Sequence, residues 1–282
     1  MLGGAQSEPL VGRSRELDVG RAMLDTAGGG RPQVLVLSGE AGIGKSRLAR
    51  AITAEAADRG ATTLWGAGQE DLALPYLPLT TALDPLGHER LSPLDGVARL
   101  SGADRGPTEV WADVTDMLLE AASHTTVVLV IDDLQWTDPA SQALLQHLMV
   151  VLDHAATTRA VHLLTVITVR TPVADERTVR TLSRLQREPH AVSLEVTGLD
   201  RAEVRELLGI LGPAPVSATL AHRVMESTSG NPLHTQSVLR RGLDDGRLTV
   251  VSGTLVADPG DPLAVSADEL DRSVVDRLDR VG

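Results

Sequence analysis

The feature that most constrains this chain is a glycine-rich segment at residues 39–46, GEAGIGKS. It matches G-x-x-x-x-G-K-S/T at every fixed position, follows an apolar run at residues 34–37 and precedes residues 47–52, which have helical spacing. A strand, a glycine loop and a helix in this order form a phosphate cradle, because glycines let backbone N–H groups turn towards the phosphate and the helix N-terminus adds partial positive charge. The sequence therefore predicts a phosphate-binding loop, called the phosphate loop below.

Two side chains of the phosphate loop have distinct predicted roles. Lys45 is placed to reach the β- and γ-phosphates, and the Ser46 hydroxyl to hold Mg²⁺. Lys45 is also the only lysine among the 26 lysine and arginine residues of the chain. GC-rich coding explains the loss of the other lysines, but arginine's planar fork would not fit beneath a curled glycine loop. Both explanations indicate that Lys45 is functional.

The composition narrows the class of protein. At 282 residues the chain is longer than one typical domain, which predicts a larger and a smaller domain. Its 42% hydrophobic content is enough for cores, and with no Phe and one Tyr these cores must be largely aliphatic. The absence of cysteine excludes disulfides, thiolate metal sites and cysteine nucleophiles. The histidines lack metal-binding spacing and no serine lies in a G-x-S-x-G context, so we predict no metal beyond Mg²⁺ and no hydrolase triad.

Charge and hydropathy point to a cytoplasmic chain without membrane contact. The net charge is −12 and the arginines form no block, which disfavours direct nucleic-acid binding, because that requires a positive face. No apolar run approaches the roughly 20 residues of a membrane span, and the N-terminus lacks a signal-peptide pattern.

Strand and helix patterns alternate along the first two thirds of the chain. The β-branched run at residues 126–131 and the apolar run at 161–169 are typical of strands buried on both faces of a parallel sheet. Asp138 followed by Pro139 predicts a helix start. After a flexible N-terminus (residues 1–9), this alternation predicts a three-layer α/β domain over residues 10–198.

The pattern changes after Gly198. Three helical patterns, at residues 200–211, 216–228 and 232–243, predict a smaller helical domain over residues 199–245. A hairpin and one more helix are predicted over residues 246–282. The chain ends without a closing feature, which predicts the front part of a longer protein or a cut one.

A second, acidic element is expected in an ATP site to manage Mg²⁺ and the attacking water. The segment VVLVIDDLQW provides it, because an apolar strand ends there in two carboxylates. We predict that Asp132 holds Mg²⁺ and that Asp133 orients the water, with a capping turn as the alternative. Arg170 ends the next strand, and since parallel strands direct their carboxyl ends to one crevice, it is a candidate to meet the γ-phosphate. The alternative is a surface arginine.

Several segments, in order, resemble one group of proteins. LVGRSREL, LSGEAGIGKSRL, LPYLPL, VVLVIDDLQWTDPAS and SGNPLHTQSVL are together similar to the signal-transduction ATPases with numerous domains (STAND). The most similar member is the nucleotide-binding module of large ATP-binding LuxR-family regulators, which include maltose-regulator-like activators. The resemblance covers about residues 10–280. It implies a P-loop NTPase fold of the AAA (ASCE) type, followed by a smaller helical domain and the start of a winged-helix-like segment.

The resemblance also implies a slow ATPase that acts as a switch, closed with ADP and opened by ATP and an unknown inducer for self-assembly. DNA would be bound only by an output domain that these residues do not include. The implied catalytic residues are Asp133, Lys45 and Arg170, and Ser46 and Asp132 are the implied ligands of Mg²⁺. The implied nucleotide-binding residues are Val11, Gly12, Arg13, Gly39, Glu40, Ala41, Gly42, Ile43, Gly44, Lys45, Ser46, Arg47 and, against the adenine, Pro232.

Other functions stay open. One is an AAA-type ATPase that remodels a partner, and another is the same module fused to a cyclase or kinase output. A small-molecule kinase is a further alternative, although no acceptor pocket or lid arginine cluster is visible in the sequence. For the GNP segment at residues 230–232, a turn with a first-turn proline is the alternative to a role at the adenine.

Overall fold

The computed structural model describes residues 10–70, 72, 74–86 and 107–258. The predictions of a flexible N-terminus (residues 1–9) and of a winged-helix-like start (within residues 259–282) lie outside the described residues. The chain divides into two compact units. The larger contains residues 14–40 and 45–196, and the described part of the smaller contains residues 10–13, 41–44 and 197–258.

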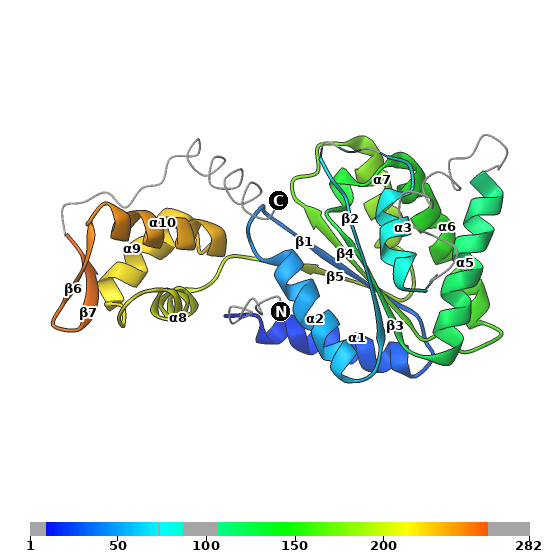
Figure 1. The fold of residues 1–282 in the computed structure, drawn as a ribbon, viewed down its shortest axis with the longest axis horizontal. Helices are drawn as coiled ribbons and strands as arrows, with labels where there is room; N and C mark the ends of the chain where they lie inside the picture. The colour runs from blue at the N-terminus through cyan, green and yellow to red at the C-terminus, as the bar shows by residue number, and fades with distance from the viewer. Residues whose placement is uncertain (1–9, 71, 73, 87–106, 259–282) are drawn as a thin grey trace. The chain divides into compact units, whose positions relative to one another are not determined.

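The larger unit is built on a five-stranded parallel sheet with the order β2-β3-β4-β1-β5 (Figure 1). Its strands are β1 (Gln33–Gly39), β2 (Thr62–Ala67), β3 (Val127–Asp132), β4 (Leu163–Arg170) and β5 (Ala191–Glu195). Because β4 lies between β1 and β3, the carboxyl ends of these three strands are neighbours. Gly39, at the end of β1, is in register with Arg170, at the end of β4.

Helices cover both faces of this sheet. They are α1 (Ser14–Gly28), α2 (Lys45–Asp58), α3 (Leu77–Leu83), α5 (Pro107–His124), α6 (Pro139–Ala156) and α7 (Glu176–Leu185), with short 3-10 turns η1 (Asp84–Leu86) and η2 (Leu134–Trp136). α1 and α2 lie on one face, and α3, α5, α6 and α7 on the other (Figure 1). These three layers confirm the predicted α/β P-loop NTPase fold.

The sheet is held by the aliphatic core that the composition predicts. All six residues of β3 and seven of the eight in β4 are buried, because helices exclude water from both faces. The core on the α5–α6 face contains residues such as Leu129, Ile131, Leu144 and Leu148, and Tyr76 is its one buried aromatic among the described residues.

Two helix starts show how local sequence positions these elements. α6 begins after Asp138, whose carboxylate accepts hydrogen bonds from the backbone N–H groups of Ala140 (3.0 Å) and Ser141 (2.9 Å). α7 begins after Asp175, which accepts from Thr178 N–H at 2.8 Å. Such caps satisfy N–H groups that the helix itself leaves unpaired. The first of them confirms the predicted start at Asp138.

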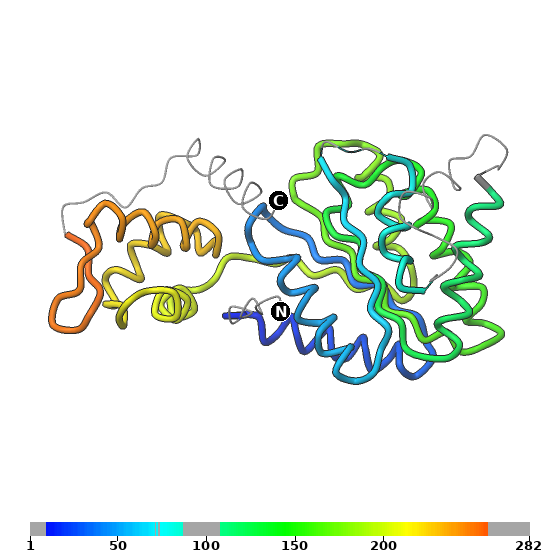
Figure 2. Tube along the Cα trace, in the orientation of Figure 1, coloured from blue at the N-terminus to red at the C-terminus, as the bar shows by residue number. Residues whose placement is uncertain are grey.

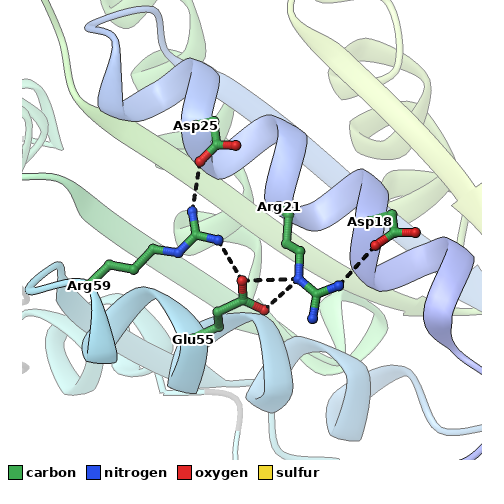
Figure 3. Close-up of polar contacts among 5 residues, drawn as sticks. All are labelled: Asp18, Arg21, Asp25, Glu55 and Arg59. Atoms are coloured by element: carbon green, nitrogen blue, oxygen red, sulfur yellow. Dashed lines mark hydrogen bonds and ion pairs between the residues drawn. The ribbon is translucent and has the colours of Figure 1, made fainter.

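An ion-pair network joins α1 to α2, the helix that follows the phosphate loop (Figure 3). The Glu55 carboxylate accepts from Arg21 Nε at 2.8 Å and also pairs with Arg59. Each arginine has a further carboxylate partner, Asp18 for Arg21 (2.9 Å) and Asp25 for Arg59 (2.7 Å). Exposed pairs of this kind contribute little to the free energy of folding. The main effect of the network is therefore to specify which helix faces pack against each other.

The smaller unit contains three helices and a hairpin. The helices are α8 (Arg201–Leu211), α9 (Ala218–Thr228) and α10 (Pro232–Asp244), followed by antiparallel β6 (Leu248–Val251) and β7 (Thr254–Ala257), as the chain trace shows (Figure 2). Leu248 and Leu255 are buried in the same cluster as Val204, Leu220 and Val238 of the helices. The hairpin thus shares one core with the helices. In the parts of the chain that the structure describes, no helix has both the length and the apolar character needed to cross a membrane.

Candidate functional site

The phosphate loop lies between the end of β1 at Gly39 and the start of α2 at Lys45. Gly42 and Gly44 have φ angles of 74° and 105°, which residues with a Cβ atom rarely adopt. Backbone turns of this kind expose successive N–H groups on the concave side of a loop. The geometry of the loop is therefore suited to hold an anion.

The Lys45 side chain is buried beneath this loop, with 5% of its surface exposed. Its ammonium donates to the backbone carbonyls of Gly39 (2.9 Å) and Glu40 (2.8 Å). Burial lowers the pKa of Lys45 from 10.5 to about 8, with Asp133 opposing and Arg170 reinforcing this effect. The loop thus holds a compact cation that has lost most of its water, which strengthens its attraction to an anion.

Asp132 lies at the tip of β3 and is 6% exposed. Its Oδ1 atom accepts hydrogen bonds from the Ser46 hydroxyl (2.8 Å) and from the Thr168 hydroxyl of β4 (2.6 Å). The Thr168 hydroxyl also accepts from Asp133 N–H at 2.9 Å. Thr168 therefore fixes both the carboxylate of Asp132 and the backbone of Asp133.

The Ser46 and Asp132 oxygens suit Mg²⁺. Adjacent ligands in an octahedron with 2.0–2.1 Å bonds lie about 2.9 Å apart, close to the 2.8 Å between these two oxygens. Mg²⁺ also prefers few protein ligands, completed by water and phosphate oxygens. Within the described ranges, no group of three or more His, Cys, Asp or Glu residues could hold a metal ion.

Asp133 turns away from Asp132 because its backbone is left-handed, with φ 55° and ψ 61°. Asp tolerates this conformation better than most residues. The carboxylate of Asp133 accepts from Gln135 Nε2 at 2.7 Å and pairs with Arg170 Nε at 3.6 Å. The two neighbouring carboxylates therefore face different partners, Ser46 for Asp132 and Arg170 for Asp133.

The turn that carries Asp133 is supported from two other elements. Gly68 follows β2, and a Cβ atom there would lie 2.6 Å from the carbonyl oxygen of Asp133 and from the carbonyl carbon of Trp136. Gln142 of α6 donates to the carbonyls of Leu134 (3.3 Å) and Thr137 (3.1 Å). Only glycine permits the close approach at Gly68, so the turn is held rigidly.

The larger unit thus brings five predicted site residues to one edge of its sheet: Lys45, Ser46, Asp132, Asp133 and Arg170. The guanidinium carbon of Arg170 also lies 5.7 Å from the ring centroid of Trp136. Arg47 belongs to the first turn of α2.

Of the other predicted nucleotide-binding residues, Gly39 and Glu40 belong to the larger unit, and residues 11–13, 41–44 and 232 belong to the smaller unit. Val11 is buried in its core, and Pro232 is the first residue of α10. Arg13, which follows Gly12, is buried and donates to the carbonyls of Ile43 (3.0 Å) and Thr197 (2.8 Å). The roles of Val11, Gly12, Arg13 and Pro232 at a nucleotide stay predictions.

Four residues of these arrangements were missed from the sequence: Thr168, Gln135, Gly68 and Asn231. In the smaller unit Asn231 caps α10 and donates from Nδ2 to the carbonyl of Ala41 at 2.9 Å. Thr168 could have been singled out because it places a hydroxyl within an otherwise aliphatic strand pattern. Gln135 lies inside the acidic segment already singled out, but its contacts depend on the turn at Asp133.

Replacing Thr168 with valine should destabilise the protein by about 1–3 kcal/mol. Valine has nearly the same shape but leaves the N–H of Asp133 and one bond of Asp132 unsatisfied in a buried setting. Urea unfolding of the variant measures the loss, with Thr125→Val as a control, since the Thr125 hydroxyl makes one exposed hydrogen bond (3.3 Å). Equal stability of the Thr168 variant and the wild type would contradict this role.

Comparison with known proteins identifies the family. The family described as "AAA ATPase domain" matches residues 9–166, which is more than half of the chain. The chain belongs to the AAA ATPase family. No curated protein matches this AAA ATPase sequence.

Solved structures of similar fold include two DNA-associated or nucleotide-bound proteins. The ORC1 protein of Aeropyrum pernix in complex with DNA has a TM-score of 0.57 and 15% identity, over 96% of this chain and 66% of that chain. AMPPCP-bound DnaA of Aquifex aeolicus has a TM-score of 0.52 and 15% identity, over 85% of this chain and 65% of that chain. This AAA ATPase chain thus spans slightly less than two thirds of each of these proteins, and at such identity the likeness shows the fold alone.

Proposed function

We propose that this chain is an ATP-binding, slowly hydrolysing regulatory switch module of a LuxR-type transcriptional regulator of the STAND group. Nucleotide state would control domain opening and self-assembly. The observation that carries this proposal is the pairing of Asp133 with Arg170. The carboxylate expected to orient the attacking water is engaged by a cation, which favours retention of nucleotide over rapid turnover.

ATP binding would use the phosphate loop and its buried lysine. Lys45 would bind the β- and γ-phosphates, and loop N–H groups would complete the cradle. Ser46 and Asp132 would hold Mg²⁺, which when bound would neutralise charge on the β- and γ-phosphate oxygens. The family resemblance adds Val11, Gly12, Arg13 and Pro232 on the nucleoside side, and Arg47 near the phosphate cradle.

Hydrolysis would require Asp133 to be released from Arg170. Asp133 would then orient a water molecule, whose oxygen bonds to the γ-phosphorus while the bond to the ADP oxygen breaks. The water's protons end on phosphate and solvent, so the products are ADP and inorganic phosphate. Arg170 would meanwhile offset the charge on the γ-phosphoryl oxygens. A movement of the Arg170 guanidinium from Asp133 to the γ-phosphate would therefore both release Asp133 and stabilise the phosphoryl charge.

A second candidate function is an AAA ATPase that remodels a partner, which membership of the AAA ATPase family supports equally. Turnover distinguishes the two functions. A switch should hydrolyse far more slowly than the roughly 1–1,000 per second of typical enzymes and should elute larger with ATP than with ADP. Rapid turnover stimulated by a partner, at constant size, would contradict the switch. A fused cyclase or kinase output remains compatible with this switch, and any DNA contact would belong to a further domain.

The affinity for ATP should fall as pH rises above about 8. Burial lowers the pKa of Lys45 to about 8, whereas a bound phosphate would raise it again by attraction. Binding therefore takes up a proton near this pH, and the affinity should be nearly constant below about pH 7 and fall up to about tenfold per unit above pH 8. Titration calorimetry in buffers of different ionisation heat measures both effects. An affinity independent of pH between 7 and 10 would contradict the lowered pKa.

A further inference from the structure

The Gln135 side chain lies between the carboxylate of Asp133 and the end of β4. Its Nε2 donates to Asp133 Oδ1 at 2.7 Å, and its Oε1 accepts from the backbone N–H of Arg170 at 3.0 Å. A backbone N–H can only donate and a carboxylate can only accept, so both contacts specify the same orientation of the amide. Glutamine alone among side chains of this length offers a donor and an acceptor in these positions.

These contacts close a ring of interactions around Asp133. The same Oδ1 atom that accepts from Gln135 lies 3.6 Å from Arg170 Nε. The guanidinium of Arg170 in turn lies over the ring of Trp136, the residue after Gln135. Each of these groups therefore limits the positions of the others. A movement of the Arg170 guanidinium would remove one of the two partners of the Asp133 carboxylate.

The turn itself has supports that do not involve the Gln135 side chain. Thr168 holds the N–H of Asp133 at 2.9 Å, Gly68 contacts the turn from β2, and Gln142 binds two of its carbonyls. Gln135 is also only half-buried. Its amide is therefore not needed to build the turn, which leaves the orientation of the Asp133 side chain as its specific effect.

We propose that Gln135 is a positioning residue that orients the Asp133 carboxylate and couples it to Arg170. This proposal rests on the proposed function, in which Asp133 orients the attacking water. When the guanidinium of Arg170 turns to a terminal phosphate, Asp133 loses one of its two partners. The neutral amide of Gln135 keeps the carboxylate in place and leaves its second oxygen available to water.

The test compares Gln135→Met, which keeps length and flexibility but makes neither bond, with the wild type, Asp133→Asn and the double variant, all in the full chain. Gln135→Met should lower kcat about ten- to hundredfold, as expected for a misplaced catalytic group, with the Kd for ATP and the melting temperature unchanged. In the Asp133→Asn background it should lower kcat no further, because the effect passes through Asp133. Gln135→Glu keeps only the acceptor and should be at least as slow.

A second readout does not depend on hydrolysis. In the Trp65→Phe, Trp111→Phe chain, Trp136 is the only tryptophan, and its emission reports the position of Arg170. Gln135→Met should shift this emission before any nucleotide is added. If Gln135→Met keeps both the wild-type kcat and the wild-type emission, the proposal is overturned. It is also overturned if the double variant loses kcat by the product of the two single losses, because the effect of Gln135 would then not pass through Asp133. If the wild type hydrolyses no ATP, the proposed function fails, and the Trp136 emission alone decides the role of Gln135.

Discussion

Replacing Lys45 with alanine is expected to abolish measurable ATP binding, with an affinity at least about a hundredfold weaker than that of the wild type. The ammonium is buried below the phosphate loop, where its charge is poorly screened, and it would make charge-assisted hydrogen bonds to two phosphates. Alanine removes all of these bonds. Fluorescence anisotropy with a labelled ATP analogue measures the effect directly.

Two further variants control this result. Arg50→Ala removes an exposed cation of α2 that lies five residues after Lys45, with its guanidinium carbon 5.2 Å from the ring centroid of Trp65. This variant should bind ATP normally. Lys45→Arg keeps the charge but should still bind poorly, because the planar guanidinium does not fit the space of the ammonium. ATP affinity retained in Lys45→Ala would show that the phosphate loop is not the nucleotide cradle.

Replacing Asp133 with asparagine should leave ATP binding within a few fold of the wild type and lower kcat by at least about a hundredfold. The amide keeps the size of the side chain and can still bond to Gln135. It has no negative charge to polarise the attacking water or to hold Arg170, which lies 3.6 Å away. Phosphate release at saturating Mg·ATP measures the loss.

Asp153→Asn is the matched control, because Asp153 is an exposed carboxylate on α6 that lies 4.0 Å from His190 Nε2. This variant should hydrolyse ATP at the wild-type rate. Unchanged phosphate release in Asp133→Asn would remove Asp133 from the proposed mechanism and transfer the water-orienting role to another group.

Much of the larger unit could be predicted because its information is local. The continuous apolar run of β3 indicates a strand covered on both faces, and the change to two carboxylates marks its end. The glycine pattern of the phosphate loop likewise needs no distant residue. The strands observed at Val127–Asp132 and Leu163–Arg170 differ from the predicted runs by one or two residues at their ends.

What could not be predicted depends on how distant segments meet. Thr168 contacts Asp132 only because β4 lies between β1 and β3, which no local pattern shows. Gln135 reaches Arg170 only because Asp133 adopts a left-handed backbone. The close approach of Gly68 to the same turn requires the pairing of β2 with β3. These contacts support the candidate site, and each of them crosses between separate elements.

The hairpin of the smaller unit illustrates the same point. Its strands were expected from sequence, but its packing was not. Leu255 of β7 bridges to Val216 in the connection between α8 and α9, and its N–H donates to Pro215 O at 2.8 Å. The proline-rich connection, which alone predicts only a break between helices, therefore also supplies an edge for the hairpin.

Isothermal titration of Mg·ATP into the full chain tests the central claim most directly. We predict saturable binding at one site per chain, with ADP competing for the same site and with Lys45→Ala giving no heat of binding. A wild-type protein that binds neither nucleotide at millimolar concentration would contradict a nucleotide switch at the phosphate loop.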